Sequence, residues 1–132
     1  MSETANILVV DDYAASRYAL ARMLRRQGYE TREVTTGEGM WAAFRERSPD
    51  LLILDVNLPD ASGFDICRQL KDDPAHRAMP IVIISASYVA FDRSERLEAS
   101  GADAFIEQPL LAEELGEVVR NLLQRSRAAN RG

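Results

Sequence analysis

Three uninterrupted apolar blocks constrain the fold of this chain more than any other feature of its sequence. They occupy residues 7–10 (Ile-Leu-Val-Val), 51–54 (Leu-Leu-Ile-Leu) and 81–84 (Ile-Val-Ile-Ile). A strand with one solvated face alternates apolar and polar residues, and these blocks do not alternate. Strands of this kind are typical of a parallel sheet that is covered on both faces.

The remaining segments complete a repeating pattern of strands and helices. Residues 29–34 are predicted to form a weaker edge strand, and residues 103–106 a short fifth strand. Between the strands, apolar residues recur at helical spacing. The predicted helices cover residues 13–27, 36–47, 63–70, 91–100 and a last segment with an apolar stripe from Leu111 to Leu123. Five strand–helix units in succession imply right-handed crossovers and one doubly wound α/β sheet.

Length, charge and cysteine content limit the class of protein further. A chain of 132 residues has the size of one compact domain, which we expect to cover residues 1–125. We expect the polar stretch 126–132 to be a frayed tail or the start of a linker. Cys67 is the only cysteine, so an internal disulfide framework is excluded.

The same composition argues against two kinds of partner. No apolar run approaches the ~20 residues that a membrane span needs. The net charge of −5, from 16 Lys+Arg and 21 Asp+Glu, argues against direct binding of nucleic acid. We therefore expect a soluble, cytoplasmic domain that binds neither membrane nor nucleic acid directly.

Polar side chains follow the predicted strands at their C-terminal ends. Asp11 and Asp12 follow the first strand, Asp55 the third, Ser85 the fourth and Gln108 the fifth. In a parallel sheet these ends meet at one edge, where open α/β folds bind their ligands. Three carboxylates held together repel one another unless a proton or a cation relieves the repulsion. Mg²⁺ suits such a set, because it binds a few carboxylates and keeps several waters.

In combination, these motifs resemble the receiver domain of bacterial two-component response regulators, over about residues 6–125. The resemblance is carried by Val9-Val10-Asp11-Asp12, Leu54-Asp55-Val56-Asn57-Leu58-Pro59-Asp60-Ala61-Ser62-Gly63, Ile84-Ser85-Ala86, Gly101-Ala102-Asp103-Ala104-Phe105 and Gln108-Pro109. It implies a flavodoxin-like (βα)5 fold with a five-stranded parallel sheet in the order 2-1-3-4-5.

The resemblance also implies a phosphoacceptor and a metal site. Asp55 would receive a phosphoryl group from a phosphohistidine on a histidine kinase or a histidine phosphotransfer protein. Asp12 and Asp55 would ligate Mg²⁺ directly together with the backbone carbonyl of Asn57. Asp11 would act partly through water. Such a domain is a signalling switch rather than an enzyme.

Three more positions concern the switch. Ser85 would donate its hydroxyl to the phosphoryl group, and Phe105 occupies the position of the family's switch aromatic. The family usually has Lys where this chain has Gln108, which brings no charge to the phosphoryl oxygens. Two interpretations stay open: phosphorylation of Asp55 with weaker or altered switching, or a protein-interaction module whose output does not depend on phosphorylation.

Other readings of the sequence are less well supported. A phosphatase of the haloacid dehalogenase type also uses an Asp nucleophile with Mg²⁺, but it needs a second acid where this chain has Asn57. Glycine-rich phosphate loops are missing from the sequence.

We expect His76, the only histidine, to be a surface residue, and Cys67 to be a small core or half-buried residue. A homodimer and a covalently linked kinase or output domain are left open.

Overall fold

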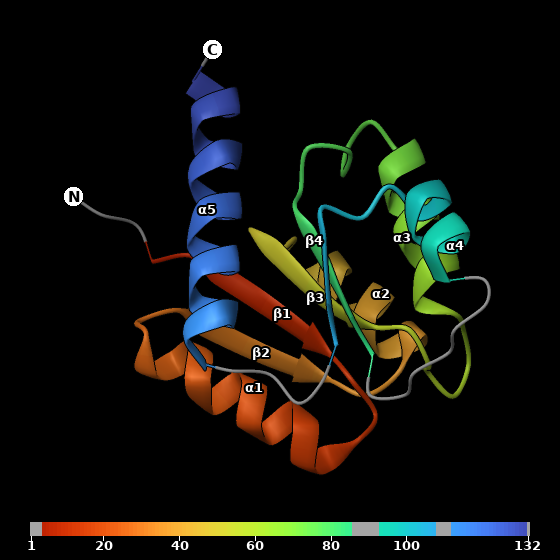
Figure 1. The fold of residues 1–132 in the computed structure, drawn as a ribbon, viewed down its shortest axis with the longest axis horizontal. Coiled ribbons are helices and arrows are strands. Elements are labelled where there is room, and N and C mark those ends of the chain that lie inside the picture. The colour runs from red at the N-terminus through yellow and green to blue at the C-terminus, as the bar shows by residue number, and fades with distance from the viewer. Residues whose placement is uncertain (1–3, 86–92, 108–111, 132) are drawn as a thin grey trace.

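The computed structural model describes residues 4–85, 93–107 and 112–131 of the chain. Within these ranges strands and helices alternate, as the sequence predicts (Figure 1). The elements are β1 (Asn6–Val10), α1 (Ala14–Arg26), β2 (Glu30–Val34), α2 (Gly37–Glu46), β3 (Leu51–Asp55), α3 (Gly63–Asp72), β4 (Ile81–Ser85), α4 (Arg93–Ser100), β5 (Ala104–Glu107) and α5 (Ala112–Arg131).

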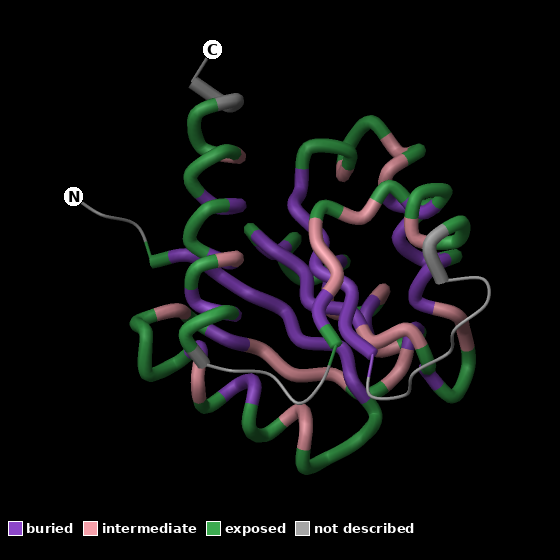
Figure 2. Tube along the Cα trace, in the orientation of Figure 1, coloured by how far each residue is buried: buried purple, intermediate pink, exposed green. Residues whose placement is uncertain are grey.

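The strands form one parallel sheet in the order β2-β1-β3-β4-β5. This confirms the predicted flavodoxin-like (βα)5 class and strand order. The three apolar blocks became β1, β3 and β4, which are the inner strands of the sheet and are buried almost throughout (Figure 2). The predicted weaker strand is β2, which lies at an edge and is only partly buried.

The sheet separates two hydrophobic cores, which explains why the inner strands carry no polar alternation. In Figure 1, α1 and α5 cover one face of the sheet, while α2, α3 and α4 lie on the other. Along β1, Ile7 and Val9 belong to the core under α1 and α5, and Leu8 and Val10 belong to the opposite core. Successive side chains of a strand point to opposite faces, so both kinds of position must be apolar.

Some element boundaries differ from the prediction. β5 begins at Ala104 rather than at residue 103, and the carboxylate of Asp103, just before the strand, accepts hydrogen bonds from Ile81 N–H and Lys71 Nζ. α3 continues to Asp72. For the predicted helix 91–100, residues 91 and 92 lie outside the described residues, and α4 begins at Arg93.

The end of the chain is helical as far as the structure describes it. α5 runs through Arg131, well beyond Leu123, the last of its core residues. Residues 124–131 include three Arg and two Ala and neither Gly nor Pro, so they can continue the helix despite the lower helix propensity of Ser126 and Asn130. The domain boundary at residue 125 stays a prediction. Among the described residues, no helix combines the length and apolar character that crossing a membrane requires.

Candidate acidic site at the strand ends

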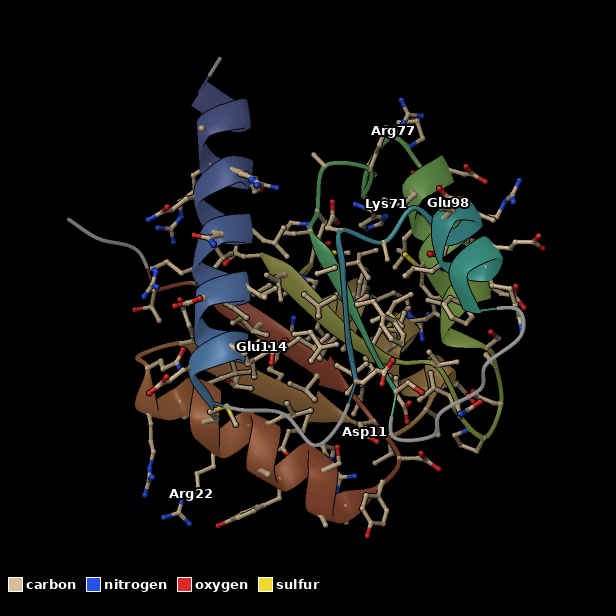
Figure 3. All side chains as sticks on the ribbon, viewed as in Figure 1. Asp11, Arg22, Lys71, Arg77, Glu98 and Glu114 are labelled. Carbon is tan, nitrogen blue, oxygen red and sulfur yellow. The ribbon has the colours of Figure 1, made fainter. Side chains whose placement is uncertain are left out.

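Three carboxylates come together at the C-terminal ends of β1 and β3. Asp11 and Asp12 directly follow β1, and Asp55 is the last residue of β3. One carboxylate oxygen from each lies within 4.8 Å of the others. The two strands are neighbours in the sheet, with Val10 opposite Leu54, so their ends coincide. The convergence inferred from the strand ends is therefore present, and Figure 3 labels Asp11 at this edge.

Asp11 is held in place by bonds to both its main chain and its side chain. Its N–H donates to Val34 O at 3.1 Å, and its carboxylate accepts the N–H of Tyr13 at 2.9 Å. Its carbonyl accepts a hydrogen bond from Arg17 Nη1 at 3.1 Å, and Arg17 is in turn paired with Glu33. With only 2% of its surface exposed, Asp11 is a fixed, buried carboxylate, whereas Asp12 is exposed.

The electrostatics of Asp55 reflect this crowded arrangement. The pKa of Asp55 is raised from 3.8 to about 7, mainly by burial and also by the neighbouring carboxylates of Asp11 and Asp12. The N–H of Asn57 acts in the opposite direction, because it donates to Asp55 and lowers the pKa. That bond spans 3.2 Å. A carboxyl group with such a pKa holds a proton that a cation can replace. The donors are all oxygen atoms, so the set fits Mg²⁺.

The loop after Asp55 is closely packed against the end of β3. A Cβ atom on Gly63 would lie 2.3 Å from the backbone oxygen of Asp55, so a side chain at this position is excluded. Gly63 N–H donates to Val56 O at 2.8 Å, and Asn57 and Ser62 pair across the loop. The loop thus turns tightly and keeps Asn57 beside the acidic site.

Ser85 and Phe105 lie on the next two strands. Ser85 ends β4 at the same edge of the sheet and is 6% exposed. Phe105 lies on β5 opposite Ile83 and packs, partly buried, against the core under α2 and α3. Gln108 lies outside the described residues. The assigned roles of Ser85, Phe105, Gln108 and the metal ligands stay predictions.

Three other polar or reactive residues lie elsewhere. His76 is half-buried rather than a plain surface residue: its Nδ1 lies 2.8 Å from Asp73 Oδ2, and its ring packs on Phe44. Cys67 is fully buried in the core, as one reading of the sequence expected, and burial raises its pKa to about 11. Lys71 lies at the opposite edge of the sheet, with its Nζ 2.8 Å from Asp103 Oδ2 (Figure 3).

The sequence did not predict the hydrogen bond from Arg17 to the Asp11 carbonyl, nor the hydrogen bonds that Asp60 accepts from Gly37 and Glu38. The signal for Arg17 was its place one turn into α1, since helical side chains lean toward the helix N-terminus and so reach back to the strand end. The signal for Asp60 was weaker, because its partners Gly37 and Glu38 lie 22 to 23 residues away in the chain.

A family model described as the response regulator receiver domain matches residues 7–120. The chain belongs to this family.

Individual relatives agree with this assignment. The response regulator PleD of Caulobacter vibrioides is 40% identical over 107 residues, which cover 81% of this chain and 23% of that protein. The DNA-binding response regulator MtrA of Mycolicibacterium paratuberculosis is 40% identical over 120 residues, covering 91% of this chain and 52% of that protein. This chain therefore spans about half or less of the length of these curated relatives.

A solved structure of similar extent is the signal receiver domain of a signal transduction histidine kinase from Syntrophus aciditrophicus. It superimposes with a TM-score of 0.85 at 30% identity, covering 92% of this chain and 91% of that one. Receiver domains of this family act in signalling.

Proposed function

We propose that this domain is the Mg²⁺-dependent phosphoacceptor of a two-component pathway, with Asp55 as the acceptor. The observation that carries the proposal is the convergence of Asp11, Asp12 and Asp55. Burial, together with these neighbouring carboxylates, raises the pKa of Asp55 to about 7. Perturbed carboxylates at the C-terminal edge of a parallel sheet are typical of functional sites. The donor of the phosphoryl group is a phosphohistidine on a histidine kinase or a histidine phosphotransfer protein.

The transfer requires few groups from the protein, and this chain supplies them. An Asp55 carboxylate oxygen forms a bond to phosphorus, the P–N bond of the phosphohistidine breaks, and the imidazole nitrogen leaves with the electron pair. Asp12, Asp55 and the Asn57 carbonyl would hold Mg²⁺, with Asp11 acting partly through water, and the ion would supply positive charge for the phosphoryl oxygens. Asp55 must lose its proton, while Asp11 stays fixed by its bonds to Tyr13 and Val34. A carboxylate is a weak nucleophile, so positioning provides most of the catalysis.

Phosphorylation then changes the charge at the strand ends. The acyl phosphate carries more negative charge than the carboxylate, and the Ser85 hydroxyl turns to donate to it. Phe105, which is only partly buried, turns inward in response. This makes a two-state element that is biased by a local charge change.

The second candidate function is a protein-interaction module that does not depend on phosphorylation. It is favoured by Gln108 at the usual Lys position, together with the engagement of Lys71, the only lysine of the chain, at the opposite edge. A charged donor bonds roughly twice as strongly as a neutral one. Under the first function, Gln108→Lys strengthens the conformational response to phosphorylation; under the second it changes nothing.

The surroundings of the domain follow from the same proposal. It is a cytoplasmic signalling domain rather than an enzyme, and it does not itself bind nucleic acid or membrane. Whether a kinase or output domain is linked to it in one chain is left open. A homodimer is left open.

The test is the intact mass of the domain after incubation with Mg²⁺ and a small acyl-phosphate donor. We expect one phosphoryl adduct, which is lost in Asp55→Asn and in a metal-free sample. If Mg²⁺ binds but neither the small donor nor a cognate phosphohistidine protein yields an adduct, the proposal is wrong and the interaction module is favoured.

A further inference from the structure

Asp60 ties the loop between β3 and α3 to the first turn of α2. Its Oδ1 accepts the N–H of Gly37 at 2.8 Å, and its Oδ2 accepts the N–H of Glu38 at 2.9 Å. The first N–H groups of a helix have no partner within the helix, so a carboxylate placed there is strongly held. These two bonds lower the pKa of Asp60, which keeps its carboxylate ionised at neutral pH.

The loop sits directly on α2 at this point. A Cβ atom on Gly37 would lie 3.3 Å from Asp60 Oδ1 and 3.3 Å from Ile66 Cδ1. Any side chain at position 37 would therefore press against the loop. The next N–H along the helix, that of Gly39, is bonded by the side chain of Thr36, so Asp60 and Thr36 divide the helix terminus between them.

A short series of bonds leads from Asp60 to the carbonyl of Asn57. Leu58 N–H donates to Ala61 O, the residue next to Asp60, at 3.2 Å. The Asn57 carbonyl and the Leu58 N–H belong to one planar peptide unit and point in opposite directions. Whatever fixes the Leu58 N–H on Ala61 therefore fixes the direction of the Asn57 carbonyl.

We propose that Asp60 is a positioning residue for the metal site: by fastening residues 57–61 to α2, it holds the Asn57 carbonyl in the orientation for Mg²⁺ ligation. This inference rests on the function proposed above and deepens it. Mg²⁺ requires near-octahedral geometry, so a carbonyl whose orientation is not fixed binds it less tightly.

The proposal predicts a graded loss of metal affinity. Residues that orient metal ligands change affinity by about 10–100-fold when they are replaced, and a backbone carbonyl is one ligand among several. We expect Asp60→Ala to weaken Mg²⁺ binding about tenfold, at the lower end of that range. Asp60→Asn keeps one carbonyl oxygen as acceptor, so its loss should be smaller.

Coupling between two sites is reciprocal, which gives a second measurement on the unmodified protein. If the loop and α2 are fastened through Asp60, Mg²⁺ should slow the hydrogen exchange of the Gly37 and Glu38 amides. The effect should disappear in Asp60→Ala.

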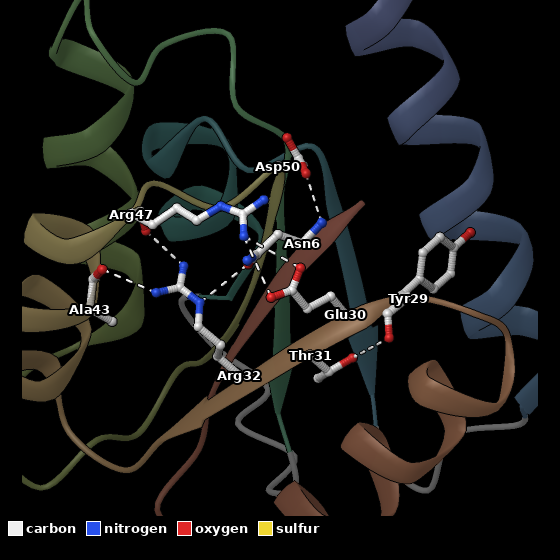
Figure 4. Close-up of polar contacts among 8 residues, drawn as sticks. All are labelled: Asn6, Tyr29, Glu30, Thr31, Arg32, Ala43, Arg47 and Asp50. Carbon is white, nitrogen blue, oxygen red and sulfur yellow. Dashed lines mark hydrogen bonds and ion pairs between the residues drawn. The ribbon is translucent and has the colours of Figure 1, made fainter. Parts of the chain in front are cut away.

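Asp50 offers a matched control at the other end of β3. It is also an exposed carboxylate that accepts a backbone N–H from a distant segment, that of Asn6 at 2.7 Å (Figure 4). It lies at the N-terminal edge of the sheet, just before Leu51, whereas the acidic site lies at the C-terminal end of the same strand. Both Asp50→Ala and Asp60→Ala remove hydrogen bonds to backbone N–H groups and should lower the melting temperature, but Asp50→Ala should leave Mg²⁺ affinity unchanged.

The experiment is Mg²⁺ titration by calorimetry on wild type, Asp60→Ala, Asp60→Asn and Asp50→Ala, with amide exchange by NMR in parallel. The proposal is supported if Asp60→Ala binds Mg²⁺ most weakly, Asp60→Asn binds it with intermediate affinity, and Asp50→Ala binds it as wild type does. Equal Mg²⁺ affinity of Asp60→Ala and wild type overturns it. It is also overturned if Mg²⁺ does not change the hydrogen-exchange rates of the Gly37 and Glu38 amides in wild type. If wild type itself binds no Mg²⁺, the proposed function fails and this inference with it. Should Asp60→Ala fail to fold, Asp60→Asn and the wild-type exchange data still decide.

Discussion

At the N-terminal ends of the strands, the Asp103 carboxylate accepts hydrogen bonds from Lys71 Nζ and from Ile81 N–H, both at 2.8 Å. At the C-terminal ends of the same sheet, the carboxylates of Asp11, Asp12 and Asp55 face one another within 4.8 Å. Arg17 lies beside them but bonds the Asp11 backbone and Glu33.

The difference shows what an acid at a strand end can be used for. Asp103 is neutralised by a cation and by a backbone donor, so it contributes to stability. Among the described residues, none of the three acids at the other edge forms an ion pair with Lys or Arg, although Asp11 and Asp55 accept the N–H groups of Tyr13 and Asn57. Burial and the neighbouring carboxylates raise the pKa of Asp55. A cluster of carboxylates with a perturbed pKa is typical of functional sites.

Removal of Asp103 should give the largest effect on stability. Asp103→Ala leaves the mostly buried Lys71 ammonium without its counter-charge and Ile81 N–H without its acceptor. We expect a loss of about 2–3 kcal/mol in the free energy of unfolding, measured by urea denaturation. Mg²⁺ affinity should stay at the wild-type value. A large change in Mg²⁺ affinity would mean that the two edges are not independent.

Removal of Asp55 should have a smaller effect of opposite sign in the metal-free protein. The folded-state pKa is raised to about 7 from 3.8, so the proton on Asp55 stabilises the folded protein below about pH 4, and this contribution is lost as the pH rises through 7. Asp11 and Asp12 face Asp55 and increase the repulsion once it ionises. Asp55→Asn does not titrate, so it should be more stable than wild type at pH 8, by about 1–2 kcal/mol after solvent screening of a half-exposed group.

Urea unfolding at pH 5 and pH 8, without metal, checks this expectation. The advantage of Asp55→Asn over wild type should grow between the two pH values. An advantage that is the same at both would show that charge repulsion at this edge does not destabilise the fold.

Much of the fold was predictable because three uninterrupted apolar blocks are typical of the inner strands of a parallel sheet that is covered on both faces. The order of strands needed the family resemblance. The ends of α3 and α5 were not predictable from apolar spacing, since both helices continue past their last core residues, Leu70 and Leu123.

The candidate site was predictable only where it depends on strand ends. Asp11, Asp12 and Asp55 follow apolar blocks directly, so the sheet alone brings them together. The bonds of Asp60 to α2 and of Lys71 to Asp103 join segments that are 22 to 32 residues apart, so no local sequence pattern predicts them. Such contacts depend on how the loops fold over the finished sheet.

The most direct test of the central claim is to locate the phosphoryl group. The domain is incubated with Mg²⁺ and a small acyl-phosphate donor, the acyl phosphate is reduced with borohydride, and peptides are sequenced by mass spectrometry. The account predicts conversion of Asp55 to homoserine, with Asp11, Asp12 and Asp103 unchanged. Reduction at Asp11 or Asp12 in place of Asp55 would contradict it.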